Sequence, residues 1–271
     1  MIILKPYDVF LLSDGRGFKK GESNFRESVF FINPIPILGA VNKITGKKLN
    51  VEFISLIKNN KLYFRAPITI KKVKKENKIV LPKLKKLKTK FITKQPVDYI
   101  LDYDTQEKLE DINSYVDFDI LIDFLLDKPI NITEEKKLMP TYELRTGIEI
   151  NKETGTTQER MLYTQNFIRL EEGGFYIKFN ENVDLDFATV GGEGKLFVAK
   201  NSQDFTKDFE KVKNQIKEKV RENEYFKIVL LTSTNAVPEI DGARLIAKFI
   251  GKHITYSGWM SFYKDKKNLP T

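Results

Sequence analysis

Residues 146–179 read TGIEINKETGTTQERMLYTQNFIRLEEGGFYIKF, and they decide the fold because β-rich runs alternate here with the turn signals KETG and EEGG. Runs of β-branched and aromatic residues between glycine-containing turns are typical of strands. The stretch therefore predicts a β-hairpin followed by a further strand. Outward from it, residues 2–12 are β-like, and KLYFRAPITI (61–70) and FKIVLLTST (226–234) also predict strands.

Apolar residues at helical spacing predict helices between these strands. Residues 205–223, FTKDFEKVKNQIKEKVREN, carry Phe205, Phe209, Val212, Ile216 and Val220 on one face. FINPIPILGAVNKITG (31–46) predicts a short apolar helix that begins at its prolines and ends at its glycine. We also expect VEFISLIK (51–58) to continue as a helix.

Strands that pair around amphipathic helices indicate an α+β fold with helices on one face of the sheets. Two ferredoxin-like βαββαβ domains fit this pattern, with a boundary within the polar, proline-flanked segment 128–141. We expect an N-terminal domain over 1–135 with a lysine-rich insertion at 71–94. The C-terminal domain over 136–271 would hold the hairpin (146–166) and a glycine-rich loop (190–195).

Composition excludes several classes of chemistry. The chain has no cysteine, hence no disulfide, thiolate zinc site or cysteine nucleophile, and its one histidine, His253, lacks the partners of a metal site or an acid–base pair. No nucleophile-elbow pattern is present. We expect no catalytic residues, no metal and no cofactor. Without an apolar run of about 18 residues or a signal peptide, we expect a soluble, cytoplasmic protein with no membrane partner.

Charge is strongly segregated along a chain whose net charge is +9. Residues 71–94 hold eleven lysines and one acid, whereas the stretch from Asp98 to Asp127 holds ten acids and one lysine. The lysine run is a solvated face, a phosphate-backbone contact, or the partner of the acidic run within the chain. The acidic run faces solvent or a basic partner under the first two readings.

The loop in TVGGEGKLFVAK (189–200) matches neither a P-loop nor a dinucleotide fingerprint, because its glycines have the wrong spacing and a strand-like run follows. Two alternatives remain. The glycines supply positive φ in a tight strand connection, or their bare backbone lets N–H groups approach a phosphate beside Lys195.

Five motifs in order carry a family resemblance: KPYDVFLLSDGRGFKKGE, NPIPILGAVNKI, the segment from Arg145 to Phe179, VGGEGK and GWMSFY. Together they resemble the third subunit of the Cmr (type III-B) CRISPR effector complex, in the RAMP superfamily. The resemblance implies two ferredoxin-like, RRM-related domains in a non-catalytic subunit. Such a subunit holds the 5′ repeat-derived tag of the CRISPR RNA, and binds the polymerase-like large subunit and neighbouring RAMP subunits in antiviral defence.

The resemblance also assigns RNA-binding residues. The glycine-rich loop maps onto Gly191, Gly192, Glu193, Gly194 and Lys195, and the N-terminal motif onto Asp14, Gly15 and Arg16. Gly39 and Ala40 match the start of a helix whose N-terminal dipole favours phosphate. The protruding hairpin contributes Arg145, Lys152 and Arg160, and the candidate stacking aromatics are Phe18, Tyr163 and Trp259.

The sequence departs from the family pattern in three places. Lys195 and Asn42 stand where family members often carry arginine, so the first keeps charge without the guanidinium fork and the second loses it. Relatives also continue beyond the GW motif, and we expect the last strand of the second domain to be absent or replaced. Two other functions remain open: a metal-independent RAMP endoribonuclease that processes repeat RNA through His253, and a subunit that mainly bridges proteins.

Overall fold

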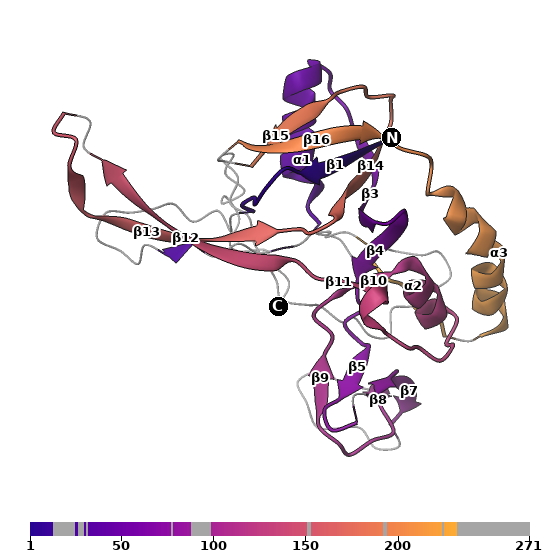
Figure 1. Ribbon diagram of the computed structural model, residues 1–271. Helices are drawn as coiled ribbons and strands as arrows, with labels where there is room; N and C mark the ends of the chain where they lie inside the picture. The colour runs from indigo at the N-terminus through magenta and orange to yellow at the C-terminus, as the bar shows by residue number, and fades with distance from the viewer. Residues whose placement is uncertain are drawn as a thin grey trace, which may run out of the picture. The chain divides into compact units, whose positions relative to one another are not determined.

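The computed structural model describes residues 1–12, 25–26, 30, 32–76, 78–87, 99–150, 153–191, 194–223 and 225–231, with the backbone alone at 25–26, 149 and 157–163 (Figure 1). The chain forms two compact units. The first contains Met1–Asn59 and Pro140–Gln203, and the second contains Asn60–Met139 and the segment that begins at Asp204. The chain crosses from the second unit to the first between residues 139 and 140, near the predicted boundary at 135/136. Its crossings between the units at 59/60 and 203/204 have no counterpart in the predicted division.

An antiparallel sheet forms the centre of the first unit. Its strands lie in the order β3 (Val51–Lys58), β14 (Gly173–Phe179), β1 (Ile2–Pro6), β16 (Lys195–Asn201) and β15 (Phe187–Val190). Helix α1 (Pro34–Thr45) contacts β3 and β15 (Figure 1). Because β14 lies between β1 and β3, the β1-α1-β3 segment is a split β-α-β unit. Residues 180–186, between β14 and β15, contain no helix, and two complete βαββαβ domains remain a prediction.

Helix α1 confirms the predicted helix at 31–46. Asn33 caps it by accepting a 3.0 Å hydrogen bond from the Ile35 N–H, and Gly46 ends it at φ +66°. The predicted position of Gly39 and Ala40 at a helix start is wrong, because both lie in the middle of α1. The helix dipole therefore does not favour an anion at Gly39, since that field acts at the first turn.

The prediction that residues 51–58 continue as a helix is also wrong. They form β3, whose backbone pairs with β14 from Gly173 to Phe179. Ile54, Leu56 and Ile57 are all buried, so both faces of this strand are covered. A continuous apolar run has no periodicity that separates a buried strand from a buried helix, which explains the error.

The predicted hairpin is confirmed and is longer than 146–166. Strand β12 (Thr141–Ile150) pairs antiparallel with β13 (Thr157–Arg169), and β2 (Phe25–Arg26) adds to β13 in parallel. Strand β14 follows, as the sequence predicts. Phe10 ties the N-terminal segment to the base of the hairpin, because it exchanges backbone hydrogen bonds of 2.9 and 2.8 Å with Ile168.

Four aromatic rings fill the core of the first unit. Phe10 lies 5.3 Å from Phe197 and 5.9 Å from Phe175, measured between ring centroids, and Phe30 closes the group at 6.3 Å from Phe10. Edge-to-face contacts at these separations stabilise a core beyond the area they bury. Phe10, four residues after the end of β1, is therefore fixed against the sheet.

The second unit combines short antiparallel sheets with helices. One sheet has the order β11 (Lys137–Leu138), β10 (Tyr115–Asp117) and β4 (Lys61–Arg65), and another has β6 (Ile79–Val80), β5 (Lys71–Val73) and β9 (Leu109–Asp111). Strands β7 (Lys83–Lys86) and β8 (Tyr99–Asp102) pair with each other. The helices are α2 (Phe118–Leu125), a 3₁₀ turn at Glu134–Lys136, and α3 (Lys207–Glu222).

Helix α3 confirms the helix predicted from its apolar stripe, and it packs Phe209 at 4.5 Å from Phe118 between ring centroids. The strand predicted at 226–234 is wrong over the residues that the structure describes, because 226–231 form no strand. Phe226, Ile228 and Leu230 are exposed there, while the Lys227 ammonium donates to the Phe124 carbonyl. In the described chain, no helix has the length and apolar character needed to cross a membrane.

Candidate nucleic-acid interface

The glycine-rich loop is the turn of the β15–β16 hairpin. Gly191 and Gly194 have φ of +84° and +58°, and the Gly194 N–H donates a 3.1 Å hydrogen bond to the Gly191 carbonyl. A Cβ at Gly191 would lie 3.0 Å from the Leu11 carbonyl oxygen, whereas one at Gly194 would meet nothing within 4 Å. The glycines therefore satisfy a backbone requirement of the turn, and their presence alone does not identify a phosphate site.

The contact at Gly191 brings two of the sequence motifs close together. Leu11 comes three residues before Asp14, and its carbonyl oxygen faces the turn. Leu11 is itself buried in a cluster with Val9 and Phe167. The glycine turn, the end of the N-terminal segment and the base of the hairpin therefore meet in one place.

Lys195, the first residue of β16, lies over an aromatic ring at this junction. Its Nζ is 4.9 Å from the centroid of Phe167, and the Arg145 Cζ is 5.4 Å from the same centroid. Phe167 is 4% exposed. Attraction to this one buried ring holds the two cationic side chains near each other beside the glycine turn.

Arg145 also belongs to an ionic network at the base of the hairpin. Glu143 accepts from Arg145 at 2.7 Å and from Arg169 at 2.6 Å, and Asp8 accepts from the same guanidinium groups at 3.2 and 3.0 Å. These hydrogen bonds, that from Arg169 foremost, hold the pKa of Glu143 below its ordinary value. The guanidinium of Arg145 is thus oriented by two carboxylates rather than presented at the tip of the hairpin.

Five of the eight lysines that the structure describes in the lysine run form ion pairs within the chain. Strand β5 pairs with β9 and strand β7 with β8, which places lysines opposite acids. The ion pairs join Lys71 to Asp111, Lys74 to Glu110, Lys75 to Glu107, Lys83 to Asp104 and Lys85 to Asp102. Of the three alternatives for this run, intramolecular pairing is the one that these residues adopt.

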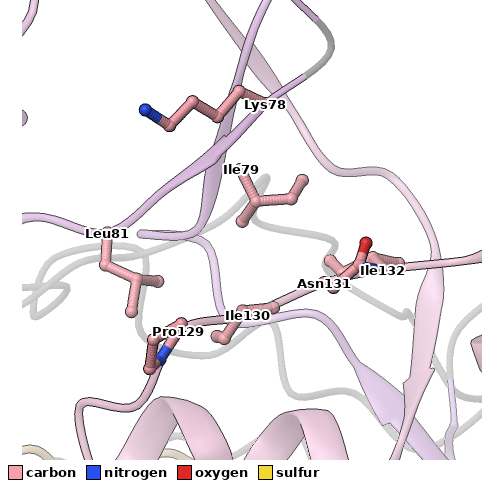
Figure 2. Close-up of a pocket in the computed structure, with 7 residues that line it drawn as sticks. All are labelled: Lys78, Ile79, Leu81, Pro129, Ile130, Asn131 and Ile132. Atoms are coloured by element: carbon pink, nitrogen blue, oxygen red, sulfur yellow. The ribbon is translucent and has the colours of Figure 1, made fainter.

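The second unit also contains a cleft of about 400 Å³. Lys78, Ile79 and Leu81 lie on one side of it and the segment 129–132 on the other (Figure 2). Ile130 and Ile132 also pack against the buried cluster of Ala66, Val116 and Ile120. The lining offers one amine and one amide but no carboxylate, so it lacks the groups of an acid–base or metal site. Among the residues described, no group of three His, Cys, Asp or Glu side chains is placed to hold a metal ion.

The sequence of the whole chain decides the family. The family model for the CRISPR-associated protein (Cas_Cmr3) matches residues 2–270. The chain belongs to the Cas_Cmr3 family. The resemblance to the family of the third Cmr subunit is thereby confirmed. Comparison with curated proteins found no match for this Cas_Cmr3 chain.

Two solved structures are similar to this Cas_Cmr3 chain over 74% of its length. One is a cryo-EM structure of the Type III-B Cmr-beta bound to cognate target RNA and AMPPnP, state 1, with 14% identity and a TM-score of 0.46. The other is Cmr-beta bound to cognate target RNA, with 15% identity and a TM-score of 0.46. The chain spans 62% and 64% of the lengths of the chains it matches.

The structure brings together part of the predicted interface. Gly191, Gly194, Lys195 and Arg145 meet at one junction, whereas Gly39 and Ala40 lie within α1. Outside the described residues are Asp14, Gly15, Arg16, Phe18, Lys152, Gly192, Glu193, His253 and Trp259, and at Arg160 and Tyr163 the backbone alone is described.

Sequence reasoning missed four residues of this Cas_Cmr3 junction: Asp8, Glu143, Phe167 and Arg169. The charges of Glu143, Arg145 and Arg169 lie at β-strand positions that become neighbours through the β12–β13 register. Glu143 pairs with Phe167, and Arg145 with Gln165, across that register. A period-2 reading of each hairpin strand would have placed Glu143 with Arg145, and Phe167 with Arg169, on one face of their strands. The register shift between Ile148 and Ile150 means that a count from the KETG turn would not have paired them.

Proposed function

We propose that this chain is a non-catalytic, RNA-binding subunit of a type III-B CRISPR effector complex. It anchors the 5′ repeat-derived tag of the CRISPR RNA and docks the polymerase-like large subunit in the cytoplasm. The family match over residues 2–270 carries this proposal. The finer architecture of two ferredoxin-like domains belongs to it, supported by the split β1-α1-β3 unit around β14.

The junction at the glycine turn supports tag binding in physical terms. Lys195 follows a turn whose first glycine packs so closely that an added Cβ would lie 3.0 Å from the Leu11 carbonyl oxygen, so the backbone there is preorganised. Phe167 attracts both Lys195 and Arg145 to one place. The Lys195 ammonium can bind a phosphate as a point charge without reading a base, as a contact to the tag's backbone requires.

The hairpin supports docking to neighbouring subunits. Tyr142, Leu144, Ile148 and Ile150 are exposed at alternate positions of β12, and therefore lie on one face of that strand. Exposed apolar side chains gathered in one stripe mark interaction surfaces more often than scattered ones do. We assign this stripe to contacts with the large subunit or adjacent RAMP subunits.

The test compares guide RNAs that carry or lack the 5′ tag, with Lys195→Ala as the variant and Lys48→Ala as the matched control. Lys48 is exposed and lies on the loop after α1, away from the glycine turn in sequence. Lys195→Ala should weaken binding of the tagged RNA and reduce the salt slope by about 0.7 for each phosphate that the variant no longer neutralises. Lys48→Ala should bind as the wild type does. Equal weakening in both variants would remove Lys195 from the site.

A further inference from the structure

A second surface of the first unit has the composition of a single-stranded RNA platform. It lies on one face of three adjacent strands, β1, β16 and β15. The register places Tyr7, Leu196 and Thr189 in one row and Lys5, Val198 and Phe187 in the next. Tyr7 continues the ladder beyond β1, because its N–H donates a 3.0 Å hydrogen bond to the Leu196 carbonyl.

Large side chains on this face are open to solvent. Tyr7 is 76% exposed, Phe187 54% and Leu196 41%, whereas Leu4, Phe197 and Ala188, which project to the opposite face, are buried in the core. Strand spacing and rise separate the backbone positions of Tyr7 and Phe187 by about 12 Å. Each ring is therefore placed to stack on a base of its own.

The charge on this face is positive. Lys5 and Lys200 are exposed, occupy diagonal positions across the β1–β16 pair, and form no ion pair with the described residues. None of the eight positions of the face, namely Ile3, Lys5, Tyr7, Phe187, Thr189, Leu196, Val198 and Lys200, is acidic. The nearest acid along β1, Asp8, is bound by Arg145 and Arg169.

We propose that the face formed by Lys5, Tyr7, Phe187 and Lys200 binds single-stranded RNA by base stacking and phosphate contact, independently of the glycine turn. Exposed rings supply stacking that tolerates every base, and lysines without an acidic neighbour on the face supply the salt-dependent attraction to phosphate. The lysines of 71–86 contrast with this face, because acids of the same unit neutralise five of them. The proposal rests on the proposed function and extends it to RNA outside the tag.

The experiment measures fluorescence anisotropy of a labelled decauridine, which has no tag, with the full-length chain across a salt series. Phe187→Ser and Tyr7→Ser should each weaken decauridine binding roughly 5- to 150-fold. Phe187→Tyr keeps an aromatic ring and should bind decauridine as the wild type does. Lys5→Glu with Lys200→Glu should weaken binding and lower the salt slope by at least about 1.4, the value for two phosphates that are no longer neutralised. Lys48→Glu, an exposed charge reversal off this face, should leave both values unchanged.

Thermal melting of each variant separates loss of binding from loss of folding. Where Tyr7→Ser melts early, Phe187→Ser and the double lysine variant still decide, because they change exposed side chains and leave the core unaltered. Decauridine affinity unchanged in Phe187→Ser and in the double lysine variant would overturn the proposal and leave this face to a protein partner. A different result would refute the proposed tag site at Lys195: Lys195→Ala would leave the preference for tagged over untagged RNA unchanged.

Discussion

Replacing Gly191 by alanine tests whether the glycine turn is fixed by packing against the N-terminal segment. The backbone at Gly191 has φ +84°, outside the left-handed region of about +50 to +70° that L-residues tolerate, and an added Cβ would lie 3.0 Å from the Leu11 carbonyl oxygen. Left-handed backbone costs roughly 1–2 kcal/mol, and the steric contact adds strain. We expect Gly191→Ala to lower the free energy of unfolding by about 2–3 kcal/mol.

Gly194→Ala is the matched control, because Gly194 has φ +58° and open space around its Cβ position. It should cost about 1 kcal/mol, from the backbone alone. Thermal melting of the full-length variants measures the difference, at about 2–4 °C per kcal/mol for domains of 150–250 residues. Equal shifts for the two alanines would refute the close packing of the turn against Leu11.

Three further predictions follow from residues away from that turn. Gly39→Ala should raise the urea midpoint, with a gain of about 0.5–1 kcal/mol, because Gly39 lies exposed inside α1 and a Cβ there meets nothing within 4 Å; a lower midpoint would contradict its mid-helix position. Burial raises the pKa of Asp117, whose Oδ1 caps α2 and whose Oδ2 has no hydrogen-bond partner among the described residues. The folded chain therefore holds this proton more tightly than the unfolded chain, and stability falls as pH rises above about 4. Asp117→Asn keeps the cap and removes the charge, so its melting temperature should exceed that of the wild type increasingly as pH rises through this window. Lys74→Ala with Lys75→Ala should change RNA affinity less than about twofold and cost at most about 1 kcal/mol per pair, because acids already neutralise both lysines; a large drop in RNA affinity in anisotropy would show that these lysines serve RNA.

The elements that the sequence predicts well are those with local signals. Prolines at 34 and 36 and glycine at 46 bound α1, and the KETG turn lies between β12 and β13. These signals act within a few residues, so a single sequence carries them. The stripe of α3 is equally local, since its apolar side chains share one face by helical period.

The elements that fail depend on partners far along the chain. Residues 51–58 are a strand because β14, more than a hundred residues later, pairs with them. Lys71 and Asp111 meet through the register of β5 with β9, which no local pattern fixes. The same holds at the candidate site, where Asp8 reaches Arg145 and Arg169 through tertiary structure. The family motifs located the glycine turn, but its geometry shows that packing also requires Gly191.

Binding of guide RNA with and without its 5′ tag tests the central claim most directly. The full-length chain, alone and with its large-subunit partner, is titrated against both RNAs from low to high salt, and RNA integrity is followed in the same samples. The account predicts tag-dependent, salt-sensitive binding without cleavage, and a loss of tag preference in Lys195→Ala. Equal affinity for the two RNAs, or cleavage of either, would contradict it.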